Sequence, residues 1–302
     1  MVCYTMINLL VRQATGQGER SIAVTLRALP TFFITLIVIL MTQHRRAQLI
    51  PGSNGFLGWK SITAILVQAL LIFSVGNSLH FESLKWGGVT ITTPISSTSA
   101  IFGGLLAYLV LGEVFNWEML VGMVVTTAGV FILMQGQARG IPVSEYWSRA
   151  VIFSLIEAFC AAVGGILLTY ALRRGADVFV AMWLSTGMAI TSMFVVLAAQ
   201  GQLSLYWSSP PEVVRDLFFA GLINTLSVLA ITQALALSPW AVVTSISRLG
   251  VVTGPLAAMF LLGEHINGLM AVGILLVLLG VVVVQWGQAR GKQHLPEPPL
   301  GS

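Results

Sequence analysis

The chain has 302 residues, of which 56% are hydrophobic and only 9% are charged, and its mean hydropathy is +0.90. A soluble domain carries about 25% charged residues, so this composition excludes a water-soluble globular protein and predicts a polytopic membrane protein in contact with the lipid bilayer. The net charge of +4 is small and forms no basic run, so nucleic acid is not an expected partner. Cys3 and Cys160 lie in separate apolar segments, and we interpret them as small core residues.

Apolar segments of near-spanning length recur along the whole chain, and a membrane span needs about 17–25 residues. The segment Met1–Val11 is too short to count as one, although its end resembles Leu167–Arg174. We therefore expect that the first helix is truncated here by about a dozen residues. Nine spans are predicted, of which the fourth and the ninth are shorter than the rest. In chain order they are Ile22–Met41, Ile62–Phe81, Val89–Leu111, Met119–Met134, Ala150–Leu172, Val178–Ala199, Leu217–Leu237, Trp240–Leu262 and Leu269–Trp286.

One apolar block occurs twice. Residues 90–130 and 241–281 align without a gap at an offset of 151, and 15 of the 41 positions are identical. The matches include glycine, asparagine and glutamate, so shared hydrophobicity does not explain them. A duplicated hydrophobic half is typical of transporters that are built from two repeats.

The repeat sets the predicted domain organisation. We expect a first repeat over residues 1–136, a connector over 137–148, a second repeat over 149–286 and a polar tail over 287–302. With five spans per half, the two halves insert in opposite directions. The predicted fold class is therefore an all-α polytopic membrane protein, a ten-helix inverted-repeat bundle of five plus five helices.

Two Leu-Gly-Glu motifs end corresponding helices of the two halves, and each is followed by a helix with two glycines seven positions apart. The motif residues are Gly112 and Glu113 in the first half and Gly263 and Glu264 in the second. This pattern resembles the EamA-type families of the drug/metabolite transporter superfamily. The resemblance implies a ten-helix transporter with a central cavity between the halves that works by alternating access. The two glutamates themselves are interpreted as structural turn elements.

Arg248 is the clearest candidate for a substrate-binding residue. An ionisable residue inside a span costs about 2.5–3.5 kcal/mol, and Arg248 lies roughly 12 Å into its span. A guanidinium binds a carboxylate or phosphate through two parallel hydrogen bonds. Glu157 is predicted at a similar depth, so it could exchange a proton or pair with Arg248. Two alternatives stay open for this pair, a substrate site and a fixed structural ion pair.

Hydroxyl groups are unusually dense around one predicted helix. They either line a polar cavity or hydrogen-bond across close helices. His80 and Glu82 fall near the membrane surface and are interpreted as solvated. The further candidate lining residues are Ser96, Ser97, Thr98, Ser99, Thr244, Ser247, Asn77 and Asn224.

No sequence motif of an enzyme, metal site or phosphate-binding loop is found, so neither an enzyme activity nor a cofactor is expected. The sequence predicts a secondary transporter of small organic metabolites in the bacterial cytoplasmic (inner) membrane, acting as a monomer or homodimer on a small-molecule substrate. The family resemblance implies an exporter rather than an importer. Two other classes stay open. A membrane-embedded enzyme needs a convergent His/Asp/Glu cluster, and an accessory or scaffold protein leaves Arg248 without a use.

Overall fold

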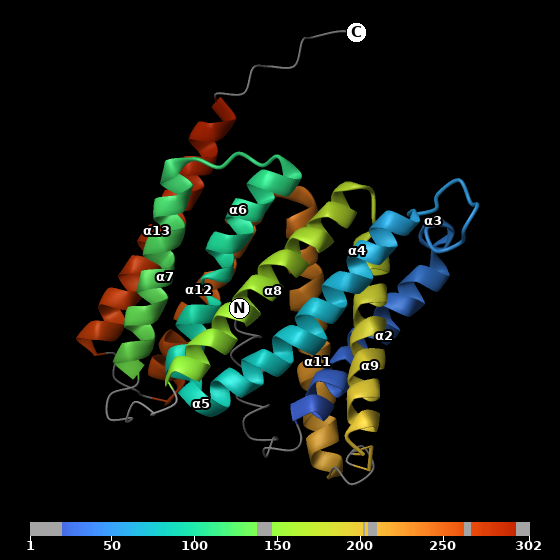
Figure 1. Ribbon diagram of the computed structural model, residues 1–302, viewed down its shortest axis with the longest axis horizontal. Helices are drawn as coiled ribbons and strands as arrows, with labels where there is room; N and C mark the ends of the chain where they lie inside the picture. Colours follow the sequence, from blue (N-terminus) through green and yellow to red (C-terminus); the bar gives the residue numbers. More distant parts are fainter. Residues whose placement is uncertain (1–19, 138–146, 202, 205–209, 263–266, 294–302) are drawn as a thin grey trace. The chain divides into compact units, whose positions relative to one another are not determined.

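The computed structural model describes residues 20–137, 147–201, 203–204, 210–262 and 267–293, and its described secondary structure is helical (Figure 1). This confirms the predicted all-α class. The helices in chain order are α2 (Arg20–Met41), α3 (Gln43–Ala47), α4 (Trp59–Ala69), the π-helix η1 (Leu70–Gly76), α5 (Asn77–Ser96), α6 (Ser99–Leu111), α7 (Trp117–Gln137), α8 (Trp147–Arg173), α9 (Val178–Ala199), α11 (Pro211–Leu237), α12 (Trp240–Leu262) and α13 (Gly268–Gln293).

The described residues include helical stretches that are long and apolar enough to cross a membrane. Two shorter apolar helices, Thr25–Met41 and Ser99–Leu111, accompany them. Large apolar side chains such as Leu109 and Leu226 are about three-quarters exposed, at 74% and 75%, as expected where lipid surrounds the protein. The chain is thus an integral membrane protein. The six long stretches are Trp59–Leu84, Trp117–Gly136, Arg149–Arg173, Val178–Ala199, Pro211–Leu237 and Gly268–Arg290.

The sequence predicted the helix bounds well, with one correction. We expected a break between Phe81 and Val89, but α5 runs through these residues and ends at Ser96. The polar residues that suggested a loop are accommodated on the helix, where Trp86 Nε1 donates a hydrogen bond to Glu82 Oε2 at 3.2 Å, one turn away. The break lies further on, between α5 and α6, where the Thr98 hydroxyl donates to the Ile95 carbonyl.

The described residues form two compact units, and each unit contains helices from both halves of the chain. The first comprises the described parts of Met1–Ser78 and Val163–Leu237, and the second those of Leu79–Ala162 and Ser238–Ser302. The boundary between them falls inside α5 and α8.

Helix α2 packs against α9 and α11 in the first unit. Its Phe32 ring stacks on Trp183 at 5.7 Å, and its buried Thr31 hydroxyl is 2.8 Å from that of Thr225. A side chain at Gly221 would collide with the backbone of α2, because an added Cβ would lie 2.8 Å from the Arg27 oxygen. Small residues and interhelical hydroxyl bonds therefore set this contact, as is common in membranes.

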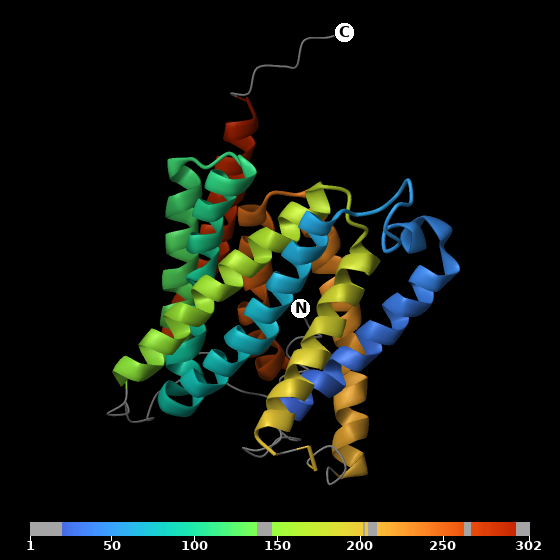
Figure 2. The same cartoon turned by 45° about the vertical axis from the view of Figure 1, so that its right-hand side comes forward.

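Helices α7 and α13, which are equivalent in the two repeats, pack side by side in the second unit (Figures 1 and 2). Asn116, before α7, donates from Nδ2 to the oxygen of Gly287 near the end of α13, at 2.7 Å. Asn267, before α13, donates to the oxygen of Gly136 near the end of α7, also at 2.7 Å. The two asparagines are 151 residues apart in the sequence, and so are the two glycines. The two helices are therefore antiparallel, and their contact has approximate two-fold symmetry.

Candidate functional site

A helix interruption in the second unit brings the predicted hydroxyl residues together. Helix α5 ends at Ser96 and α6 begins at Ser99. Tight turns satisfy the backbone across the interruption, with the Thr98 nitrogen donating to the Ile95 oxygen at 3.0 Å and the Ala100 nitrogen to the Ser97 oxygen at 3.2 Å. An interrupted helix inside a bilayer is tolerated where protein or a polar cavity surrounds it. We call residues 96–99 the hydroxyl turn.

Arg248 on α12 reaches one end of the hydroxyl turn. Its Nη2 donates to Ser99 Oγ at 2.6 Å, and Ser99 is buried with 7% of its surface exposed. In the repeat alignment Arg248 corresponds to Ser97. The guanidinium and the hydroxyl thus come from different repeats, and only the second repeat supplies a charge.

Glu157 on α8 reaches the other end of the same turn. The Ser96 hydroxyl donates to Glu157 Oε2, and His80 Nδ1 lies 3.9 Å from the same oxygen. The Glu157 side chain is 16% exposed. The direct Glu157–Arg248 ion pair stays a prediction, since in this structure the two side chains contact Ser96 and Ser99, three residues apart.

The other predicted lining residues have contacts within their own helix or belong to the first unit. Thr244 and Ser247 on α12 donate back to their own helix, to the oxygens of Trp240 at 2.9 Å and Val243 at 2.8 Å. Asn77 begins α5 and Asn224 lies within α11, and both are half-buried residues of the first unit.

The first Leu-Gly-Glu motif holds the start of the helix that carries Arg248. Gly112 takes a left-handed conformation, with φ of 65°, directly after α6. The chain then turns so that both oxygens of the buried Glu113 carboxylate accept the backbone N–H of Trp240, at 3.1 and 2.9 Å. A carboxylate at the first residue of α12 satisfies an N-terminal donor and complements the helix dipole. Gly263 and Glu264 lie outside the described residues.

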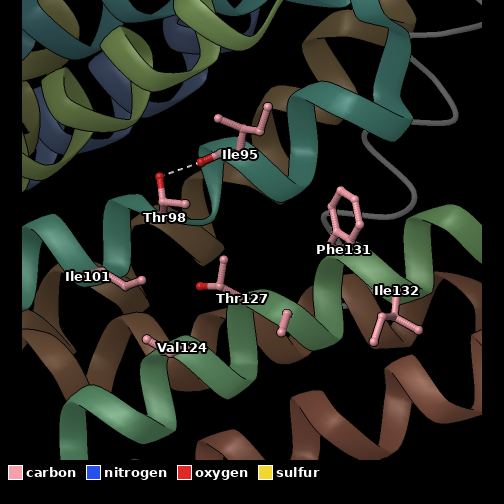
Figure 3. Close-up of a pocket in the computed structure, with 8 residues that line it drawn as sticks. Ile95, Thr98, Ile101, Val124, Thr127, Phe131 and Ile132 are labelled. Atoms are coloured by element: carbon pink, nitrogen blue, oxygen red, sulfur yellow. Dashed lines mark hydrogen bonds between the residues drawn. The ribbon is translucent and has the colours of Figure 1, made fainter. Parts of the chain in front are cut away.

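An apolar groove of about 390 Å³ lies beside the hydroxyl turn. Figure 3 shows Thr98 at its wall, with the Thr98 hydroxyl turned back to the Ile95 oxygen at 2.6 Å. Helix α7 forms the opposite wall through residues such as Thr127 and Phe131. The groove therefore offers an apolar surface next to a polar turn.

Sequence reasoning missed two features of this region. His80 was interpreted as a solvated surface residue, but the helix that carries it continues to Ser96 and places it beside Glu157. Ser83, Thr92 and Ser154 form a fully buried hydroxyl cluster, with Ser83 Oγ 2.8 Å from Thr92 Oγ1 and 2.5 Å from Ser154 Oγ. For this cluster the sequence offered one signal, which was that Ser154 lies three residues before Glu157 on the same predicted helix. Among the described side chains, no group of three or more His, Cys, Asp or Glu is arranged to hold a metal ion.

An all-helical chain with spanning helices, an interrupted helix and ionisable side chains within its spans has the features of a membrane transport protein. A family model described as the EamA-like transporter family matches residues 1–135 and 148–286, so the chain belongs to that family. The family is one of transporters rather than enzymes. The two matches show that the chain contains two EamA repeats.

Two relatives extend this result. A protein of Archaeoglobus fulgidus, described as an uncharacterized transporter, is 25% identical over 226 residues, which cover 73% of this chain and 74% of that protein. A solved crystal structure, described only as that of a protein, matches with a TM-score of 0.70 over 96% of each chain. Its sequence is 13% identical, so this likeness shows the fold alone.

Proposed function

We propose that this chain is a secondary transporter that exports small organic metabolites carrying an anionic group. It would work by alternating access, with a cavity at the membrane midplane between the two repeats, in the cytoplasmic membrane of a bacterium. The ten-helix arrangement of two inverted five-helix repeats belongs to this proposal. Membership of a transporter family and the antiparallel packing of α7 and α13 support it. The direction of transport follows the family resemblance.

The observation that carries the anionic specificity is the bond from Arg248 to Ser99 at the hydroxyl turn. An arginine within a span costs several kcal/mol unless a partner compensates it. The planar fork of donors on a guanidinium fits a carboxylate or phosphate. A substrate anion would thus bind Arg248 beside Ser99.

The groove beside Thr98 supports an apolar part in the same substrate. Its walls are mainly aliphatic and aromatic, and its volume of about 390 Å³ falls within the usual range for small-molecule sites. An anionic head at Arg248 and an apolar body along α6 and α7 would use both surfaces. Amino-acid derivatives and aromatic or branched carboxylates have this chemistry.

The test is a ligand screen followed by transport. Purified protein is screened by thermal shift against organic carboxylates, phosphorylated metabolites and neutral analogues of the same size. Compounds that raise the melting temperature are then measured for counterflow in proteoliposomes. We expect anions to score above their neutral amides or esters, and Arg248→Lys to lose most counterflow, because an ammonium cannot form the planar bidentate contact.

Arg215→Lys is the matched control. Arg215 lies near the start of α11, is exposed and pairs with its neighbour Asp216 at 3.0 Å, so this change should leave counterflow intact. Counterflow of anions that Arg248→Lys leaves at the wild-type level would contradict the assignment of Arg248. A screen in which neutral analogues score as well as the anions would contradict the substrate class.

A further inference from the structure

Glu157 and His80 form a pair of titratable side chains within the membrane-spanning part of the chain. The His80 Nδ1 atom is buried, has no hydrogen-bond partner in the described structure and lies 3.9 Å from Glu157 Oε2. The Ser96 hydroxyl donates to that same oxygen. At this separation the carboxylate and the imidazole interact through their charges rather than through a direct hydrogen bond, so the protonation of one depends on that of the other.

The remaining charged or titratable groups near the pair are few among the described side chains. Cys160 lies about one turn further along α8 and is buried. Arg149 lies eight residues before Glu157 on α8, about 12 Å along the helix, where it stacks over Trp86. Glu82 on α5 also contacts Trp86. On α12, Arg248 contacts Ser99, at the opposite end of the hydroxyl turn from Ser96.

Charge balance links the pair to Arg248. With Glu157 ionised and His80 neutral, the hydroxyl turn has one negative and one positive group at its two ends. An anion that binds Arg248 adds a negative charge to this low-dielectric region, which favours uptake of a proton by Glu157 and His80. Release of the anion reverses this effect and favours release of the proton.

We propose that Glu157 and His80 form a proton site that is filled when an anion occupies Arg248, so that the carrier moves one anion together with one proton. This inference rests on the proposed function. The empty carrier holds Arg248 positive and Glu157 negative, whereas the loaded carrier holds the anion on Arg248 and the added proton on the pair. The site charge is the same in both states. The carrier thus transfers the equivalent of an undissociated acid, and no net charge crosses the membrane.

The proton itself is the probe that tests this site, so no identified substrate is needed. Infrared difference spectra of the purified full-length protein are recorded as the pH is lowered. Because the chain has 11 acidic side chains, the titrations of the wild type and of Glu157→Gln are compared, and the wild type should show an additional carbonyl stretch of a protonated carboxyl group that Glu157→Gln lacks. His80→Gln should change the pH at which this band appears, because it removes the group that shares the proton.

Neutral variants of Arg248 imitate the charge of the anion-bound site. In Arg248→Met and in Arg248→Gln the carboxyl band of Glu157 should appear at a pH about one unit higher than in the wild type. Gel filtration and circular dichroism show whether each neutral variant folds. If one of them fails to fold, the other still tests the change in the pH of the band. Arg248→Lys, which keeps the positive charge, should stay near the wild type.

Glu212→Gln is the matched control, because Glu212 is an exposed carboxylate in the first turn of α11. This variant should keep the band that Glu157→Gln loses. A band that persists in Glu157→Gln, or a band whose pH does not change in the folded neutral variants of Arg248, overturns the proposal. A failure of the transport proposal is distinguishable, because counterflow with Arg248→Lys tests anion transport and the infrared titration tests only the proton site.

Discussion

The helix pair α7–α13 and the hydroxyl turn with its partner α12 use the same sequence repeat in opposite ways. In the α7–α13 pair the two repeats contribute equivalent hydrogen bonds, since Asn116 and Asn267 each donate to a carbonyl of the facing helix at 2.7 Å. In the second region the parts differ. Arg248 occupies the position of Ser97, and α12 is continuous where the chain between α5 and α6 is interrupted.

This difference separates the scaffold from the candidate site. A symmetric contact is stable because each half repeats a packing solution based on glycine and asparagine, residues that let helices approach and bond closely. A substrate is not symmetric, so a site for it gains from residues that only one repeat carries. Substitutions at the glycines and asparagines of α7 and α13 test whether their contact behaves as a symmetric scaffold. Substitutions at Glu113 test the support of α12, and a stability cycle addresses the asymmetric region.

The largest effect is expected from alanine at two equivalent glycines of α7 and α13, Gly129 and Gly280. An added Cβ would lie 2.6 Å from the Val277 nitrogen at Gly129 and 2.7 Å from the Gly122 oxygen at Gly280. Backbone atoms cannot move aside as a flexible side chain can, so each change should cost about 1–3 kcal/mol. Denaturation in mixed micelles measures the free energy of unfolding.

The control for these changes is Gly268→Ala, at the start of α13, where an added Cβ would meet nothing within 4 Å. This variant should unfold like the wild type. Should only one of the two glycines prove sensitive, the contact would not be the symmetric scaffold described above.

A smaller loss is expected at Glu113, which belongs to the repeated motif and holds the first residue of α12. Glu113→Ala removes both acceptors of the Trp240 N–H and should cost about 1–2 kcal/mol, as other lost helix caps do. Glu113→Gln keeps one acceptor oxygen and should lose less. Unfolding of both variants is compared with that of Glu212→Ala, which removes an exposed carboxylate. Equal losses for Glu113→Ala and Glu212→Ala would contradict the capping role.

The smallest effect is expected from the two asparagines. Asn116→Ala and Asn267→Ala each remove one interhelical hydrogen bond, and such bonds in membranes contribute about 0.6 kcal/mol on average. Because the two bonds are equivalent, the two losses should be equal within error. Gln135→Ala, at an exposed position of α7, serves as the control. A large difference between the two asparagine variants would argue against the equivalence of the repeats.

Sequence patterns predicted the scaffold better than the candidate site, for a physical reason. Hydropathy reports burial in lipid, so α9 and α12 were predicted end to end, and the 151-residue repeat identified residues that pack alike. The interruption after Ser96 was not located because it lies where the Thr98 hydroxyl donates to the Ile95 carbonyl, and hydropathy does not measure bonds between side chains and the backbone. The polar residues near Glu82 suggested a loop, but α5 continues through them, with Glu82 exposed and Ser83 buried against Ser154.

The candidate site could be predicted in part from the cost of burying charge. That cost singled out Arg248 and Glu157, and the density of hydroxyl groups singled out the segment from Ser96 to Ser99. The structure connects all three, but through Ser96 and Ser99 rather than by direct contact. His80 could not be predicted because its role depends on the helix that places it beside Glu157. Whether these residues bind a substrate stays a prediction.

The most direct test of the account is a stability cycle at Arg248 and Glu157. The free energy of unfolding is measured for the wild type, Arg248→Met, Glu157→Gln and the double variant, all without substrate. A functional pair that contacts separate ends of the hydroxyl turn should show a coupling energy of about 1.4 kcal/mol, the equivalent of the one-unit pH change expected for the Glu157 band. If the two residues are instead a fixed structural ion pair, each single change should cost about 3–5 kcal/mol and the double variant should recover most of that loss. That recovery would contradict the assignment of Arg248 and Glu157 to substrate and proton binding.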